Sequence, residues 1–199
     1  MVFTRPAPKD QHPLMFLAEA EGATRLVKLV QGGYGAGVQQ TLAKEGLAPI
    51  LYGSATVEGA PMAYVMEHLS PHELGQSKGW VTLFTFMQGW SPQEDHKVKI
   101  DERLRKVVAL MEMSGLVHGD LRPNNIMLEL KEDGSPVELD DGGVHLKVVD
   151  FDWAGPVNLA KYPKCRNKGV IWPGVDGEAI EAGHDGQMLK SWWIGSKLP

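Results

Sequence analysis

The segment GLVHGDLRPNNIML, followed further along the chain by VHLKVVDFDWAG, constrains the fold more than any other part of the sequence. Short apolar runs flank the polar residues of the first segment and precede Asp150 in the second, as in buried strands that hold a polar loop rigidly. The loop contains Asp120 and Asn125. Asp120 can orient or deprotonate a hydroxyl group, whereas Asn125 and Asp150 offer hard oxygen ligands of the kind that Mg²⁺ prefers. The pattern therefore predicts a site for a metal-bound phosphate and an acceptor hydroxyl.

Each of these residues also has a purely structural interpretation. Asp120 could accept backbone N–H bonds in a turn, and Asn124 and Asn125 could do the same. An aspartate after a Val-Val run, such as Asp150, could cap a helix. The order and spacing of these residues along the chain favour the functional interpretation over coincidence.

The same residues resemble the catalytic loop and the metal-binding segment of the protein kinase-like fold, which in protein kinases read H-R-D-x-x-x-x-N and D-F-G. Gly119 replaces the arginine, and the second motif is Asp150-Phe151-Asp152. The H-G-D loop is similar to that of small-molecule kinases such as the aminoglycoside and choline phosphotransferases. Together with the later YPKCRNKGVIWPGV, it looks most like the compact kinase-like proteins of many fungi. The resemblance covers roughly residues 14 to 190.

The order of the expected elements agrees with this resemblance. Periodicity and turn residues predict strands over 13–20 and 24–30, a helix over 37–46, a hairpin over 48–69, a helix over 98–115, a charged loop over 131–143 and a helix over 181–193. The resemblance then implies an α+β, two-lobed protein kinase-like fold in minimal form. We expect an extended N-terminal arm over residues 1–13, a reduced small lobe over 14–69 and a shortened large lobe over 70–199.

The resemblance assigns a nucleotide site to the expected small lobe. Lys28 would contact the α- and β-phosphates of ATP, and Met66 would stand beside the adenine pocket. Backbone groups of Glu67 and Leu69 would bond the adenine edge. Lys28 could instead be an exposed strand lysine and Met66 a plain core residue. Apolar alternation around Lys28 favours the inward orientation.

The catalytic set implied by the resemblance combines the loop with the strand end. Asp120 would be the base, and Lys28 and Asn125 would complete the set. Asn125 and Asp150 would hold Mg²⁺, with Asp152 as a further ligand unless it is a surface or capping carboxylate. His118 would brace the loop rather than take part in the chemistry.

The chain departs from the protein kinase pattern in three ways. No G-x-G-x-x-G loop precedes Lys28, and the first 13 residues contain too many prolines to form the preceding strand comfortably. The glycine-rich residues 31–37 follow Lys28 and are expected to form a flexible turn. The short helix offers Gln39, Gln40 and only a late Glu45 where kinases have the glutamate that pairs with the lysine. No A-P-E segment follows the second motif.

Two functions of different classes follow from the resemblance. The first is an ATP- and Mg²⁺-dependent phosphotransferase acting on a protein or small-molecule acceptor. The second is a pseudokinase that serves as a nucleotide-binding or protein-interaction module. A metal-dependent hydrolase using His118, Asp120 and His184 is a weaker third interpretation, because H-x-D alone lacks a dependable metal-ligand spacing.

Composition limits the partners and the compartment. The formal net charge of −5 argues against a nucleic-acid binder. A single cysteine, Cys165, excludes an internal disulfide framework and indicates a reducing compartment, cytoplasmic or nuclear. No apolar run is long enough to cross a membrane, and the proline-containing N-terminus is no signal peptide. Exposed apolar surface on so short a chain would favour self-association or a protein partner.

Overall fold

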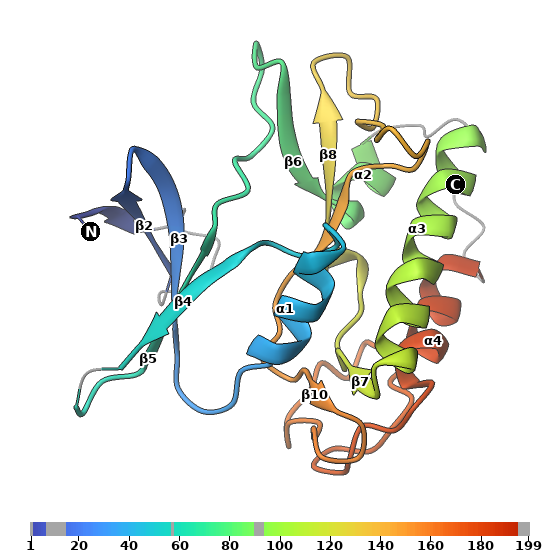
Figure 1. The fold of residues 1–199 in the computed structure, drawn as a ribbon. Helices are drawn as coiled ribbons and strands as arrows, with labels where there is room; N and C mark the ends of the chain where they lie inside the picture. The colour runs from blue at the N-terminus through green and yellow to red at the C-terminus, as the bar shows by residue number, and fades with distance from the viewer. Residues whose placement is uncertain (1, 7–14, 57, 90–93, 195–199) are drawn as a thin grey trace.

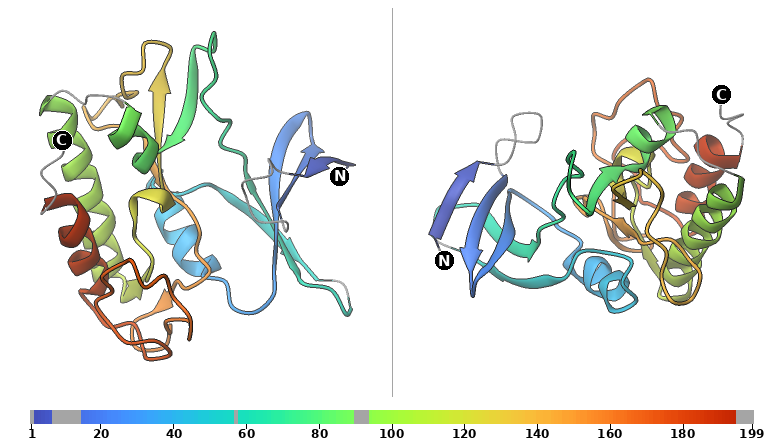
Figure 2. Two further views of the ribbon diagram at one scale, coloured as in Figure 1. Left: turned by 180° about the vertical axis from the view of Figure 1, so that it is seen from behind. Right: turned by 90° about the horizontal axis from the view of Figure 1, so that it is seen from above.

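The computed structural model describes residues 2–6, 15–56, 58–89 and 94–194. Its elements are, in order, β1 (Val2–Pro6), β2 (Met15–Ala20), β3 (Ala23–Val30), α1 (Ala36–Lys44), β4 (Leu51–Ala55), β5 (Met62–Glu67), β6 (Lys78–Thr82), α2 (Leu83–Gly89), α3 (Glu94–Met113), β7 (Leu116–Val117), the 3-10 turn η1 (Pro123–Asn125), β8 (Ile126–Lys131), β9 (Leu146–Val148), β10 (Gly155–Pro156), α4 (His184–Leu189) and the π-helical turn η2 (Lys190–Ile194). The sheet of β1–β5 lies at one side of the molecule and α3 and α4 at the other, with α1 between them (Figures 1 and 2).

The five-stranded sheet has the order β1-β2-β3-β5-β4, and its pairs are antiparallel. The expected hairpin of β2 and β3 is confirmed, and its turn places both Glu21 and Gly22 at positive φ. The second hairpin, of β4 and β5, is also confirmed, with Gly59 at φ +76° in its turn. Tight hairpin turns of this kind require left-handed residues, which is why glycine marks both of them in the sequence.

The N-terminal segment corrects one prediction. Val2–Pro6 form strand β1, which pairs with β2, so an extended arm over residues 1–13 is wrong for this part. β1 is an edge strand, its register shifts between Phe3 and Arg5, and its proline stands at its end, where a missing N–H is tolerated. Residues 7–13 lie outside the described part of the chain.

Helix α1 ends as its sequence predicts. Gly46 follows the helix at φ +68°, and its N–H donates to the carbonyl of Ala43 at 3.0 Å. Leu47 N–H donates back to Leu42 O at 2.9 Å, so the carbonyls of Leu42 and Ala43 in the last turn are satisfied. The inward face of α1 consists of Val38, Gln39 and Leu42.

Helix α3 buries the expected apolar stripe, with Ile100, Leu104, Val107 and Met111 at 1% exposure or less. The helix begins at Glu94, four residues before the predicted start at residue 98. The prediction started too late because the polar first turn carries no apolar periodicity. The helix ends before Gly115, which has φ +64° and turns the chain directly into β7 and the polar loop. The longest helix therefore positions the loop that carries the candidate site.

The main core joins α1, α3, β8 and β9, and the C-terminal part of the chain packs on it. The expected helix over 181–193 is confirmed in shorter form, as α4 and η2. Trp192 Nε1 donates to Leu121 O at 2.9 Å, and Trp193 Nε1 donates to Asp101 Oδ1 at 2.9 Å. Both indoles pack against the core.

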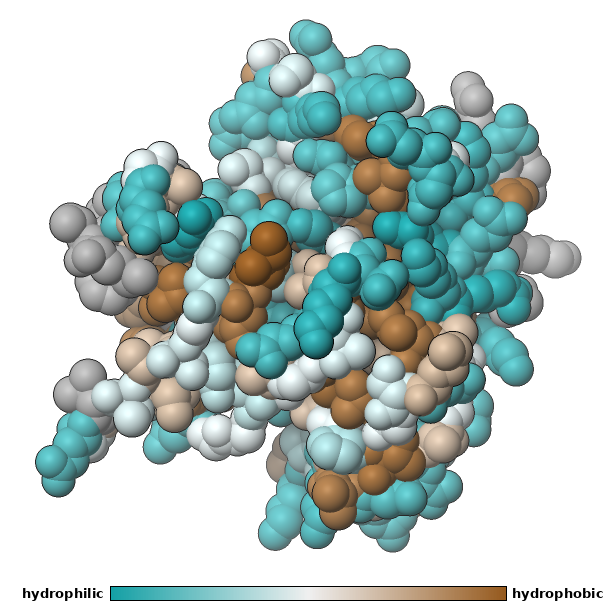
Figure 3. Space-filling model, viewed as in Figure 1, coloured by the Kyte–Doolittle hydropathy of each residue, from teal (hydrophilic) through white to brown (hydrophobic). Residues whose placement is uncertain are grey.

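The remaining segments complete the surface around the core. Residues 70–97, which sequence patterns leave unassigned, form β6 and α2 and the start of α3, and β6 joins β8 and β9 in a three-stranded sheet. Residues 131–143 form turns with isolated bridges, as expected for a charged loop. Within the described residues, no helix has the length and apolar character needed to span a bilayer. The face shown in Figure 3 is mostly hydrophilic, with apolar residues gathered along its middle.

Candidate active site

The polar loop and the strand end of the two sequence motifs meet at Val149, the residue before Asp150. His118 Nε2 lies 3.1 Å from the carbonyl oxygen of Val149. On the other side, Val149 N–H donates to the backbone carbonyl of Asn125 at 2.9 Å. These two bonds hold Asp150 beside the loop of Asp120 and Asn125. The two motifs therefore form one site.

His118 braces this loop. Its Nδ1 accepts the N–H of Asp120 at 3.2 Å, so the proton belongs on Nε2, which donates to Val149. The ring is fully buried and packs edge-on against Phe151, with centroids 5.2 Å apart. Both ring nitrogens form hydrogen bonds within the fold, so His118 positions the loop.

Gly119 stands where only glycine fits. Its φ is +81°, and a Cβ there would lie 2.5 Å from Cδ1 of the buried Ile180. Asp185, at the start of α4, accepts the N–H groups of His118 at 2.7 Å and Gly119 at 2.9 Å. Sequence reasoning missed Asp185, because nothing near it in the chain indicates so distant a partner. The H-G-D sequence and the C-terminal segment thus depend on each other.

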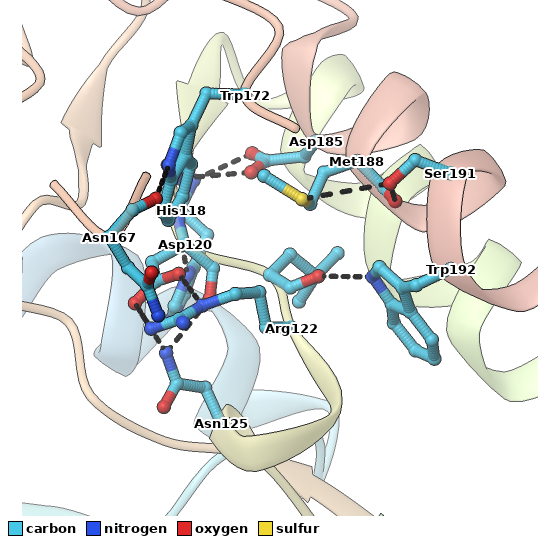
Figure 4. Close-up of polar contacts among 12 residues, drawn as sticks. His118, Asp120, Arg122, Asn125, Asn167, Trp172, Asp185, Met188, Ser191 and Trp192 are labelled. Atoms are coloured by element: carbon cyan, nitrogen blue, oxygen red, sulfur yellow. Dashed lines mark hydrogen bonds and ion pairs between the residues drawn. The ribbon is translucent and has the colours of Figure 1, made fainter. Parts of the chain in front are cut away.

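Asp120 is held by two side chains of its own loop (Figure 4). The Arg122 guanidinium binds both carboxylate oxygens, with Nη2 at 2.8 Å from Oδ2. Asn125 Nδ2 donates to the same Oδ2 at 2.8 Å and to the Asp120 carbonyl at 2.9 Å. Burial raises the pKa of the Asp120 carboxyl, against the lowering effect of Arg122 and Asn125. Arg122 is a site residue that sequence reasoning missed.

Lys28 points inward and joins the second motif. Its Nζ lies 2.6 Å from Asp150 Oδ1 and 2.6 Å from Asp152 Oδ1, and its side chain is 12% exposed. Asp150 has φ +67°, an uncommon left-handed conformation for aspartate. Lys28 pairs with Tyr64 and Leu26 pairs with Met66 across β3 and β5, so these four residues share one face of the sheet. The exposed-lysine alternative is wrong.

Helix α1 places a glutamine, rather than a glutamate, towards the sheet. Gln39 is fully buried, and its Nε2 donates to Pro49 O at 2.9 Å and lies 3.8 Å from Met66 Sδ. Its Oε1 accepts the hydroxyl of Tyr34. Burial, with the nearby Asp152 and Asp150 carboxylates, raises the pKa of Tyr34 above its usual range. Because α1 offers no carboxylate here, the carboxylate partners of Lys28 are Asp150 and Asp152, which follow β9.

The expected adenine-binding residues lie at the end of β5. Met66 is 6% exposed and packs beside Gln39. The Glu67 carboxylate accepts hydrogen bonds from Lys147 Nζ at 2.6 and 2.7 Å. The backbone N–H of Glu67 donates to Ile50 O at 2.8 Å. The Glu67 side chain therefore ties β5 to β9, a role that sequence reasoning missed. Leu69 lies two residues after Glu67.

The glycine-rich residues 31–37 pack against the second motif. Gly35 N–H donates to the carbonyl of Phe151 at 2.8 Å. A Cβ at Gly35 would lie 2.5 Å from the Cβ of Ala154. Close approach of two backbones accounts for this glycine, in agreement with a turn rather than a phosphate-binding loop.

The metal-hydrolase interpretation has no ligand set. His118 is used as described above, and His184 Nδ1 lies 3.2 Å from both the Tyr162 hydroxyl and the N–H of Glu181. Among the described residues, no three His, Cys, Asp or Glu side chains gather so that they could hold one metal ion.

No protein-family model and no curated protein sequence matches the chain. Solved structures do. The kinase PK-1 of Cydia pomonella granulovirus superimposes with a TM-score of 0.61 and 15% identity over 90% of this chain, which spans only 62% of that kinase. WaaP, in a structure with acyl carrier protein, gives a TM-score of 0.51 and 21% identity, covering 78% of this chain and 73% of WaaP. The chain therefore has an α+β, protein kinase-like fold in reduced form.

Proposed function

We propose that this chain is an ATP- and Mg²⁺-dependent phosphotransferase that moves the terminal phosphoryl group of ATP to an alcohol. The observation that carries the proposal is the convergence of Lys28, Asp150 and Asp152, with Nζ 2.6 Å from an oxygen of each carboxylate. Val149 joins this point to the loop of Asp120. Phosphoryl transfer requires a phosphate contact, a cation site and a base at fixed positions relative to one another. On this proposal, Lys28 supplies the first, Asp150 with Asp152 the second, and Asp120 the third.

The donor set of the site fits Mg²⁺. Asp150 and Asp152 already share one ammonium group, so their carboxylates converge on a position that suits a cation. Asn125 uses its Nδ2 on Asp120, and its carbonyl oxygen is turned away from that residue (Figure 4). When bound, Mg²⁺ would neutralise the charge on the transferred phosphates. Lys28 would turn from the two carboxylates towards the phosphate oxygens.

Asp120 would accept the proton of the attacking hydroxyl. Because burial raises the pKa of this carboxyl, it is a stronger base than an exposed aspartate. Arg122 and Asn125 fix the orientation of its two oxygens.

The adenine would lie beside Met66, with its edge on the backbone of Glu67 and Leu69. On this proposal, residues 14–69 together with strand β1 form the small lobe, and residues 70–199 form the large lobe. The H-G-D loop supports a relationship to the aminoglycoside and choline phosphotransferases and to the compact fungal kinase-like proteins.

A second candidate is a pseudokinase that binds nucleotide without transferring phosphate. Two observations favour it. Arg122 occupies both oxygens of Asp120, and α1 presents Gln39 in place of a glutamate. A base that stays paired and a lysine without a helix partner would position the phosphates poorly.

ADP release from Mg-ATP, with a panel of alcohols and with water alone, separates the two candidates. Asp120→Asn keeps the shape of the side chain, so ADP release should fall roughly 10²–10⁴-fold while Mg-ATP affinity stays unchanged. Asp95→Asn, at an exposed carboxylate of α3, is the matched control and should behave as the parent. Equal release by all three proteins would leave the pseudokinase.

A further inference from the structure

Residues 161–176, which we name the cap segment, form a closed loop that packs against the start of the catalytic loop. Lys161 bridges Ala179, Tyr162 N–H donates to Glu178 O at 3.0 Å, and Gly177 N–H donates to Tyr162 O at 3.1 Å. Tyr162 is buried in a small cluster with Val117, the residue before His118. The ends of the cap segment are thus fixed on the site.

An aromatic and cationic stack connects the cap segment to Asp120. Arg122, which holds the Asp120 carboxylate, has its Cζ 5.3 Å from the centroid of the Trp172 ring. Arg166 Cζ lies 5.0 Å from the same ring and 4.1 Å from the ring of Tyr162. Trp172 is only half-buried. An acceptor whose hydroxyl reaches Asp120 would therefore lie close to Arg122 and Trp172.

Arg166 is a built-in positive charge of this segment. Its side chain is 4% exposed, and it is anchored by Asp176 Oδ1 at 2.5 Å and Gly174 O at 2.7 Å. Its Nη1 is buried without a hydrogen-bond partner among the described residues. Asp176, the acidic residue of the cap segment, therefore forms its ion pair within the segment.

The cap segment is strongly basic in an acidic protein. It contains four basic residues and one acidic residue, a formal charge of +3 in a chain whose total is −5. Lys161, Lys164 and Lys168 are exposed, and within the described part of the chain none of them forms an ion pair with a carboxylate. Such a concentration of one sign attracts an oppositely charged ligand to the cap segment.

Resting on the phosphotransferase function proposed above, we infer that the acceptor is a small alcohol that carries a phosphate or carboxylate group. The cap segment attracts the anionic group, and the hydroxyl lies at Asp120. A small molecule fits better than an acidic peptide, because the cap segment offers no strand edge to an extended chain: its one bridged residue is Lys161.

Binding of matched neutral and anionic probes, without nucleotide, tests this inference. We would titrate glycerol against glycerol 3-phosphate, glucose against glucose 6-phosphate, and an acidic serine peptide, by calorimetry at low salt. Lys161→Gln/Lys164→Gln/Lys168→Gln removes the exposed charges of the cap segment. Lys44→Gln/Lys78→Gln/Lys131→Gln removes three exposed lysines elsewhere and is the matched control.

We expect a phosphorylated alcohol to bind more tightly than its neutral counterpart. The cap triple variant should weaken that binding about tenfold and the control triple variant less than twofold, with a further loss at high salt. Equal affinity for neutral and anionic probes, or equal losses in both triple variants, would overturn the inference. Binding of the acidic peptide alone would overturn a small-molecule acceptor. If anion binding persists while Mg-ATP binding and ADP release are absent, the anion site stands and the phosphotransferase proposal fails.

Discussion

Replacing Gly119 with alanine tests whether the packing of Ile180 is the reason for the H-G-D sequence. Gly119 has φ +81°, and a Cβ there would lie 2.5 Å from Cδ1 of Ile180. The left-handed backbone costs an alanine about 1–2 kcal/mol, and an extra methyl group in a packed core costs about 1–3 kcal/mol. We therefore expect Gly119→Ala to lower the free energy of unfolding by about 2–5 kcal/mol.

Two further variants separate the backbone cost from the steric cost. Gly142 has φ +79° and nothing within 4 Å of its Cβ position, so Gly142→Ala should cost about 1–2 kcal/mol from the backbone alone. Ile180→Val removes the Cδ1 atom that the new methyl group would meet. The double variant Gly119→Ala/Ile180→Val should thus be more stable than the sum of its single variants predicts, by about 1–3 kcal/mol.

Urea denaturation, followed by circular dichroism and extrapolated linearly, measures the parent and all four variants, including the single variant Ile180→Val. In a domain of this size each kcal/mol corresponds to roughly 2–4 °C in Tm, so thermal melts give an independent check. Should Gly119→Ala cost no more than Gly142→Ala, or the double variant be strictly additive, the steric explanation would be refuted.

Three other outcomes follow from the site. Arg122→Gln should raise the pKa of Asp120 further and move the acid limb of the pH–rate profile of ADP release to higher pH; an unmoved limb would contradict Asp120 as the base. Lys147→Met should lower the free energy of unfolding by about 1–3 kcal/mol in urea, because it leaves the Glu67 carboxylate without the ammonium that it binds at two oxygens. Lys28→Met leaves two converging carboxylates without that ammonium, so Mg²⁺ alone should raise its Tm more than that of the parent, and an equal response would count against a cation site there.

Local patterns were sufficient to predict most elements that position the site. The hairpin turn at Gly22, the stop of α1 at Gly46 and the apolar stripe of α3 each depend on residues close together in the sequence. Strand β1 was missed, because the prolines of the N-terminal segment argue against a strand and only pairing with β2 reveals that it lies at an edge. The pairing of a distant strand is not a local property of either segment.

The sequence motifs predicted residues of the candidate site, but they did not predict the ion pairs and hydrogen bonds that join these residues. Lys28, Asp120 and Asp150 were predicted as site positions from the motifs, whereas the ion pairs that Lys28 forms with Asp150 and Arg122 forms with Asp120 depend on tertiary packing. Asp185 binds backbone groups at His118 and Gly119 from a segment far along the chain, so no spacing rule could have found it. Contacts of this kind become visible only when the C-terminal segment is placed on the loop.

The most direct test of the proposed function is a calorimetric titration of the parent protein with ATP alone, with Mg²⁺ alone and with both. The geometry of Lys28, Asp150 and Asp152 predicts that ATP binds more tightly with Mg²⁺ than without it. The affinity should be weak, on the order of 0.1–1 mM, since no glycine-rich loop precedes Lys28 to cover the phosphates. Absence of binding heat at millimolar Mg-ATP would contradict both the phosphotransferase and the nucleotide-binding pseudokinase.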